Sequence, residues 1–151
     1  MGAERKDLEV TALDVDSDAL KVTEENARLH SVKIKVIQAD ILTVDRLPDT
    51  YNIIVSNPPY VTESERLLMH RNVLDYEPSL ALFVDDADPL IFYRQILSLA
   101  QESLSADGMV FFEINEQLGA EVVALCRRAG FKRPELFKDM NGKDRIVFVS
   151  L

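Results

Sequence analysis

The sequence predicts an α/β protein in which an open, mostly parallel sheet is covered by helices on both faces. Hydrophobic runs of strand length alternate with amphipathic helical stretches along the whole chain. The early predicted strands end in acidic or polar residues, and an Asn-Gly pair near the C-terminus is typical of a hairpin turn. We therefore expect a parallel sheet that is closed by a C-terminal antiparallel hairpin.

Length and composition are those of one globular domain. The chain has 151 residues, of which 47% are hydrophobic and 28% charged. Its apolar runs are far shorter than the roughly 20 residues of a membrane helix, and no leader sequence opens it, so we expect a cytoplasmic protein with no membrane partner. The net charge of -9 disfavours nucleic acid as a partner.

The first half of the chain predicts three strands and one helix. A double proline must end the third strand, because neither Pro58 nor Pro59 has an N–H to donate. In chain order we expect a strand over Glu9–Leu13 that ends at Asp14, a helix over Asp18–His30 capped by Asp16 or Ser17, a strand over Lys33–Gln38 that ends at Asp40, and a strand over Ile53–Val55 that stops at Ser56 and Asn57.

The second half begins with an irregular segment from Tyr60 to Asp88, which we interpret as a substrate-facing loop. Asp88 and Pro89 predict the cap and first turn of a helix that runs to Leu104. We then expect a turn at Asp107-Gly108, a strand over Met109–Ile114, a helix over Gln117–Ala129 that stops at Gly130, and strands near Glu135–Lys138 and Arg145–Leu151 joined by the Asn141-Gly142 turn.

Two aspartates follow the first two predicted strands and are candidate ligand-binding residues. In open α/β sheets, ligands bind beyond the carboxyl ends of the strands. Asp14 stands where a carboxylate accepts hydrogen bonds from a ribose diol, but a turn or cap aspartate is an equal alternative. Asp40 has the same two interpretations.

The tetrapeptide Asn57-Pro58-Pro59-Tyr60 is a more specific signal. The prolines free the Pro58 carbonyl from any sheet ladder, so that it and the Asn57 amide oxygen offer two acceptors to one NH2 group. The ring of Tyr60 can cover a planar substrate group or lie near a sulfonium. The alternative is a proline-rich turn that merely ends a buried strand.

Further segments accompany this tetrapeptide: Ala12-Leu13-Asp14, Asp18-Ala19-Leu20, Asn26-Ala27, Ser56 to Val61, and Asp75-Tyr76-Glu77-Pro78 with Leu80-Ala81-Leu82. Together they resemble the HemK/PrmC family of release-factor glutamine methyltransferases, from about Val10 to the C-terminus. The resemblance implies a Rossmann-like class I methyltransferase sheet, with S-adenosylmethionine as methyl donor and S-adenosylhomocysteine as product.

The resemblance also implies a substrate, which is the glutamine of the Gly-Gly-Gln motif in class-1 peptide chain release factors, methylated on N5. The implied catalytic residues are Asn57, Pro58 and Tyr60. The implied cofactor-binding residues are Asp14, Val15, Asp40, Ile41 and Asn57, and the implied substrate-binding residues are Asn57, Pro58, Pro59, Tyr60 and Glu77. Asn-Pro-Pro-Tyr is shared with nucleic-acid amino-methyltransferases that act on adenine or guanine, which are therefore the alternative enzyme class.

The chain departs from the family pattern at its start. Family members have a helical substrate-recognition domain, then a first strand and a glycine-rich loop, whereas residues 1–8 hold one glycine and no G-x-G pattern. We therefore expect residues 1–151 to be a partial catalytic domain that lacks the central strand of the sheet. A catalytically inactive binding module is the third alternative, and exposed strand edges predict a dimer that forms by pairing them.

The remaining reactive side chains predict no further site. Neither His30 nor His70 has a second histidine or a cysteine at metal spacing, so we expect no metal ion. Cys126 cannot form an internal disulfide, and its position on the apolar face of a helix predicts a core residue.

Overall fold

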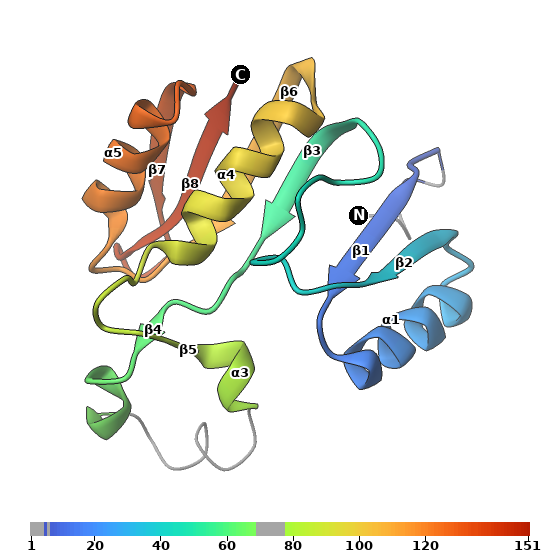
Figure 1. The fold of residues 1–151 in the computed structure, drawn as a ribbon, viewed down its shortest axis with the longest axis horizontal. Coiled ribbons are helices and arrows are strands. Elements are labelled where there is room, and N and C mark those ends of the chain that lie inside the picture. Colours follow the sequence, from blue (N-terminus) through green and yellow to red (C-terminus); the bar gives the residue numbers. More distant parts are fainter. Residues whose placement is uncertain (1–4, 6, 69–77) are drawn as a thin grey trace. The chain divides into compact units, whose positions relative to one another are not determined.

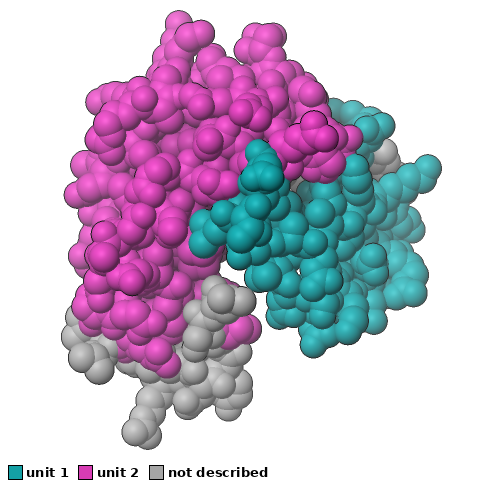
Figure 2. All heavy atoms as spheres, viewed as in Figure 1, with its two compact units in different colours: residues 1–45 teal, residues 46–151 magenta. Residues whose placement is uncertain are grey.

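The computed structural model describes residue 5, residues 7–68 and residues 78–151 (Figure 1). The chain folds into two compact units, residues 1–45 and residues 46–151, which Figure 2 shows in teal and magenta. None of the helices in these described ranges is both long and apolar enough to cross a membrane.

The first unit is a β-α-β element. Strand β1 (Val10–Asp14) pairs in parallel with β2 (Ile34–Gln38), and helix α1 (Ser17–Leu29) connects them. The expected cap is Asp16, whose carboxylate accepts the Asp18 N–H at 2.8 Å. Each of these elements lies within one residue or two of its predicted range.

The second unit is built on a four-stranded mixed sheet. Its order is β3 (Tyr51–Ser56), β6 (Leu104–Glu113), β8 (Asp144–Ser150) and β7 (Lys132–Lys138). Strands β3 and β6 are parallel, and the other two pairings are antiparallel. The predicted α/β class and the C-terminal antiparallel hairpin are therefore confirmed.

Helices α4 (Ile91–Ser103) and α5 (Gly119–Arg128) pack on this sheet and form the core with it. Tyr93 of α4 is fully buried and meets Phe112 of β6 edge-on, with ring centroids 5.3 Å apart. The rest of this core is aliphatic, apart from Phe131 and Cys126, and Cys126 is buried as predicted. Gly130 ends α5 with a φ of +80°, the conformation expected of a helix stop.

Strand β3 lies at the edge of its sheet and exposes apolar side chains. Within the described residues it pairs only with β6, and β1 likewise pairs only with β2. Val55 is 64% exposed and Ile53 is 39% exposed. The predicted edge-strand dimer would use this edge, and it stays a prediction.

Three sequence-based expectations were wrong in detail. Asp88 does not cap α4: the cap position is Leu90, and the Asp88 carboxylate binds the Arg94 guanidinium at 2.7 and 2.9 Å instead. The Asp107-Gly108 pair does not separate a helix from a strand, because it lies inside β6. Tyr51 of β3 pairs with Leu104 of β6, but Ile53 pairs with Met109. The β6 residues between these two pairings therefore form an irregularity within the strand.

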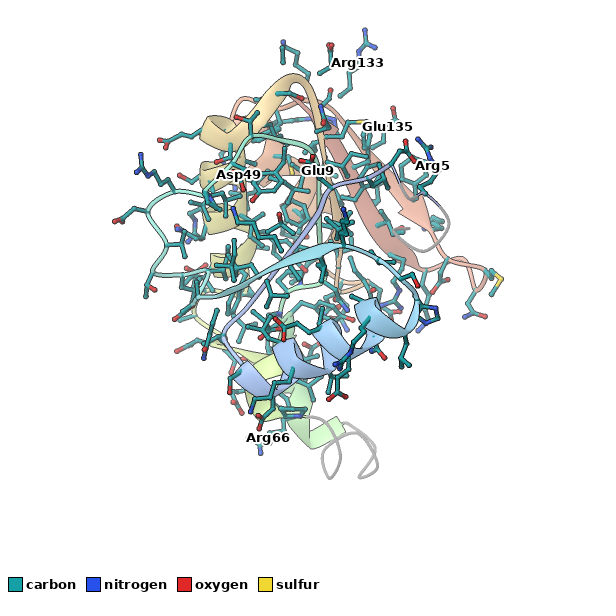
Figure 3. The ribbon with its side chains drawn as sticks, turned by 90° about the vertical axis from the view of Figure 1, so that its right-hand side faces the viewer. Arg5, Glu9, Asp49, Arg66, Arg133 and Glu135 are labelled. Atoms are coloured by element: carbon teal, nitrogen blue, oxygen red, sulfur yellow. The ribbon has the colours of Figure 1, made fainter. Side chains whose placement is uncertain are left out.

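The third error concerns the segment expected to be irregular. Beyond the tetrapeptide it contains β4 (Val61–Thr62), the 3-10 helix η1 (Glu65–Leu68), α3 (Ser79–Leu82) and β5 (Phe83–Val84), and β4 pairs in parallel with β5. Arg66, labelled in Figure 3, lies over the Phe83 ring at 4.8 Å. A strand pair of two residues a side leaves no periodicity for sequence analysis to detect.

The C-terminal hairpin forms where the Asn-Gly pair predicts it. Gly142 has a φ of +78°, which a glycine adopts without strain, and the Asp139 carboxylate accepts the N–H groups of Asn141 and Lys143. In β7, Arg133 (Figure 3) has a φ of +47° where the register with β8 shifts between Lys132 and Glu135. A bulge therefore interrupts the start of this edge strand.

Candidate active site

The Asn57–Tyr60 loop begins where β3 ends at Ser56. Pro58 is buried, Pro59 and Tyr60 are half-buried, and Asn57 is exposed. Among the described residues, none makes a hydrogen bond to the Asn57 side chain or to the Pro58 carbonyl oxygen. The two predicted acceptors are therefore both unused, and one of them is open to solvent.

Tyr60 is held at its hydroxyl by the end of a neighbouring strand. The hydroxyl donates to Oε1 of Glu113, the last residue of β6, at 3.1 Å. Burial raises the pKa of Tyr60, and the negative charge of Glu113 raises it further. The phenol is therefore a proton donor in this site and not a general base.

Glu113 has partners on both its side chain and its backbone. Its carboxylate lies 3.9 Å from Nη1 of Arg145 on β8. Its carbonyl accepts a hydrogen bond of 3.1 Å from the hydroxyl of Tyr93, which is fully buried. Burial raises the pKa of Tyr93 strongly, so this hydroxyl also stays protonated. Core packing thus fixes the residue that orients Tyr60.

Asn115 follows β6 by two residues and is 9% exposed. Its Nδ2 lies within hydrogen-bond distance of the Tyr60 carbonyl and of both carboxylate oxygens of Glu65. Burial alone would raise the pKa of Glu65, but hydrogen bonds from Thr62 and Asn115 outweigh it and lower that pKa. Glu65 is thus an ionised acceptor at neutral pH.

In the other unit, Asp14 is the last residue of β1 and Asp40 follows the end of the parallel strand β2 by two residues, at the carboxyl ends where the sequence predicts them. Asp14 accepts the Asp16 N–H at 2.9 Å, and Asp40 accepts the Leu42 N–H at 2.9 Å. Each carboxylate thus uses one oxygen for a local turn, as the alternative interpretation expected. The described residues leave the second oxygen of each carboxylate without a hydrogen-bond partner.

These residues fit the adenosyl part of S-adenosylmethionine by their chemistry. Asp14 is exposed and has an acceptor oxygen left for a ribose hydroxyl. The backbone N–H of Ile41 has no acceptor within the described residues, so it remains available to a ring nitrogen of adenine. Val15 is 43% exposed next to Asp14.

The predicted site residues therefore fall into two groups, one in each unit. Asp14, Val15, Asp40 and Ile41 belong to residues 1–45, and the Asn57–Tyr60 loop belongs to residues 46–151. Glu77 lies outside the described residues. Sequence reasoning missed Glu113 and Asn115, although both stand at the end of a predicted strand, which is the signal that identified Asp14 and Asp40.

Comparisons with known proteins show what the chain is similar to. Residues 1–75 match the family model for the methyltransferase small domain. The release factor glutamine methyltransferase of Flavobacterium psychrophilum is 48% identical over 141 residues, covering 93% of this chain and 50% of that protein. That of Bacteroides thetaiotaomicron is 42% identical over 142 residues, covering 93% and 51%. The chain thus spans about half the length of these curated relatives.

Solved structures show the same fold at low sequence identity. A methyltransferase from Pyrococcus furiosus superimposes with a TM-score of 0.68 at 16% identity, covering 99% of this chain and 66% of that one. A Streptococcus mutans protein solved in complex with SAH gives a TM-score of 0.60 at 16% identity, covering 99% and 84%. In sequence, the chain is therefore similar to about half the length of the curated release factor glutamine methyltransferases, and in fold it is similar to solved methyltransferase structures.

Proposed function

We propose that this chain is the part of a protein methyltransferase that binds the acceptor amide, and that the enzyme methylates N5 of a glutamine in the Gly-Gly-Gln motif of class-1 peptide chain release factors. The observation that carries the proposal is the pair of unused acceptors at Asn57 and Pro58, beside a tyrosine fixed by Glu113. The curated relatives are named release factor glutamine methyltransferase, which supports a release-factor glutamine as the substrate.

A glutamine amide is a poor nucleophile, because its nitrogen lone pair is delocalised into the carbonyl group. The acceptor site must therefore orient the nitrogen. The Asn57 Oδ1 and the Pro58 carbonyl oxygen each accept one N–H of the substrate amide, which fixes the direction of its nitrogen. The same two oxygens stabilise positive charge that develops on that nitrogen.

Bound S-adenosylmethionine supplies an electrophilic methyl group. Asp14 accepts hydrogen bonds from its ribose hydroxyls, while Asp40 and the Ile41 backbone face its adenine. Tyr60 packs beside the substrate amide, and Glu113 prevents its hydroxyl from turning away. No residue of this site has to act as a strong base, because the amide nitrogen becomes acidic once it is methylated and releases its proton to solvent.

The net charge of -9 favours a protein substrate over a polynucleotide. Incubation of the chain with methyl-labelled S-adenosylmethionine, a class-1 release factor and total RNA and DNA tests this choice. We expect label in the release factor, and none in a factor whose Gly-Gly-Gln glutamine is replaced by alanine. Label in RNA or DNA would show that the alternative enzyme class is correct.

Asn57→Ala tests the orientation role. It should lower kcat about a hundredfold, the scale of a misplaced reactant, and leave the affinity for S-adenosylmethionine nearly unchanged. Asn52→Ala is the matched control, since Asn52 lies on β3, the strand that precedes the loop, and makes one exposed hydrogen bond to Ser105. Equal losses of turnover and cofactor affinity in Asn57→Ala would refute the orientation role.

Calorimetric titration with S-adenosylmethionine separates binding from transfer. We expect saturable binding that Asp14→Ala removes and that Glu24→Ala, a change of an exposed acid in the same unit, leaves intact. If the chain binds no S-adenosylmethionine, residues 1–151 by themselves are catalytically inactive, and the reaction must be assayed with a longer chain.

A further inference from the structure

The Asn57–Tyr60 loop has no regular backbone ladder to hold it in place. Pro58 and Pro59 have no N–H, and the next strand pairing begins only at Val61 in β4. The contacts that fix the end of this loop are therefore made by side chains.

Asn115 and Glu65 meet at the last residue of the loop. The Asn115 Nδ2 lies 3.4 Å from the Tyr60 carbonyl oxygen, and 3.1 and 3.2 Å from the two carboxylate oxygens of Glu65. Glu65 in turn accepts the Thr62 N–H at 2.9 Å and the Thr62 hydroxyl at 3.0 Å. Asn115 thus binds this segment at the Tyr60 carbonyl, and Glu65 binds it at the Thr62 N–H.

We propose that Asn115 and Glu65 are the positioning residues of the Asn57–Tyr60 loop, and that they fix the direction in which Asn57 and the Pro58 carbonyl meet the substrate amide. This inference rests on the proposed function for the identity of that amide. The holding contacts are made at Tyr60 and Thr62, so they leave the acceptors of Asn57 and Pro58 unused.

The chemical types of the two residues suit this role. An asparagine at position 115 presents N–H groups to Glu65 and Tyr60, and its Oδ1 accepts the Gln117 N–H at 3.0 Å. An aspartate there would place a second carboxylate against Glu65, with no N–H to offer. The surroundings of Glu65 also include the Asp86 carboxylate, which Ser64 holds through its hydroxyl at 2.7 Å.

Amide hydrogen exchange of Thr62 tests the proposal without relying on catalysis. In Glu65→Ala and in Asn115→Ala, the Thr62 amide should exchange about tenfold faster, the factor for a lost hydrogen bond of about 1.4 kcal/mol. The double variant should exchange no faster than the single ones, because both changes break one network. Glu65→Gln keeps an acceptor oxygen and should restore most of the protection.

The variants and controls separate local from general effects. Glu65 meets Asn115 through Nδ2, so Glu65→Ala leaves Oδ1 of Asn115 free to accept the Gln117 N–H at the start of α5. Asn52→Ala is the matched asparagine change, and it should alter neither the Thr62 amide nor the core amides of β8. Unchanged Thr62 exchange in both Glu65→Ala and Asn115→Ala would overturn the proposal, as would additive effects in the double variant.

Methyl transfer to a release factor, measured in the same preparations, gives the second readout. Positioning predicts that kcat falls in Glu65→Ala while the KM for S-adenosylmethionine stays the same. If Thr62 exchanges faster but kcat is unchanged, Asn115 and Glu65 stabilise the loop without positioning it for the substrate amide, and the proposal is overturned. A wild-type chain that binds S-adenosylmethionine but transfers no methyl group to a release factor contradicts the proposed function instead, and the exchange of Thr62 then decides the loop positioning alone.

Discussion

Removal of the Tyr93 hydroxyl should weaken the second unit by a predictable amount. Tyr93 is fully buried, and its hydroxyl donates to the Glu113 carbonyl at 3.1 Å. Tyr93→Phe keeps the ring and its edge-on contact with Phe112, so the change removes one buried hydrogen bond and creates no large cavity. A net hydrogen bond contributes about 0.5–1.5 kcal/mol, and a buried acceptor that loses its donor adds to the cost. We therefore expect a loss of about 1–2 kcal/mol.

Urea unfolding followed through the amide signals of β8 measures this loss in the same unit. Tyr51→Phe is the matched control, because the Tyr51 hydroxyl has no hydrogen-bond partner within the described residues, and it should stay within about 0.5 kcal/mol of the wild type. Tyr93→Ala should cost about 3–5 kcal/mol through its cavity. If Tyr93→Phe proves as stable as Tyr51→Phe, the hydroxyl contributes nothing and the reasoning is wrong.

Four further changes have defined outcomes. Ser31 has a φ of +54° just beyond α1, so Ser31→Gly should stabilise the first unit by about 1 kcal/mol in thermal unfolding, whereas a decrease would contradict the strain. A Cβ at Gly108 would lie 2.8 Å from the backbone oxygen of Ser105, which cannot move aside, so Gly108→Ala should cost about 1–3 kcal/mol in urea unfolding. Burial raises the pKa of Cys126 to about 11 and leaves no exposed surface, so iodoacetamide at pH 8 should modify it only after unfolding; rapid labelling of the folded chain would disprove its burial. If exposed strand edges pair, sedimentation equilibrium should show a concentration-dependent dimer that Val55→Lys abolishes; a monomer at every concentration would exclude the pairing.

The first three predicted strands were predictable because each one is an apolar run with a clear end. The runs that end at Asp14, Gln38 and Ser56 appear in the structure with boundaries that differ by only one or two residues. The helix cap at Asp88 was not predictable, because the carboxylate has a stronger partner in the Arg94 guanidinium six residues further on. A bidentate ion pair of this kind competes directly with a capping hydrogen bond.

The candidate site was predictable only in part, for a physical reason. The Asn57–Tyr60 loop could be found from local sequence, since a double proline directly after an apolar run must end the strand there. The residues that hold it cannot be found from local sequence, because the Tyr60–Glu113 and Asn115–Glu65 contacts join positions 53 and 50 residues apart. Their one local signal is position, at or just beyond the end of a buried strand.

The side-chain contacts that fix the Asn57–Tyr60 loop are needed because of the same two prolines that leave its acceptors unused. Two adjacent residues without an N–H free the Pro58 carbonyl from backbone pairing, but they also deprive the loop of the ladder that would fix it. The structure compensates from β6, whose Glu113 binds the Tyr60 hydroxyl and whose following Asn115 binds the Tyr60 carbonyl. Because both contacts fall on Tyr60, the acceptors at Asn57 and Pro58 stay available. A loop that has to be fixed in place and also has to keep two acceptors unused must be held by side chains at one end. In this structure that end is Tyr60.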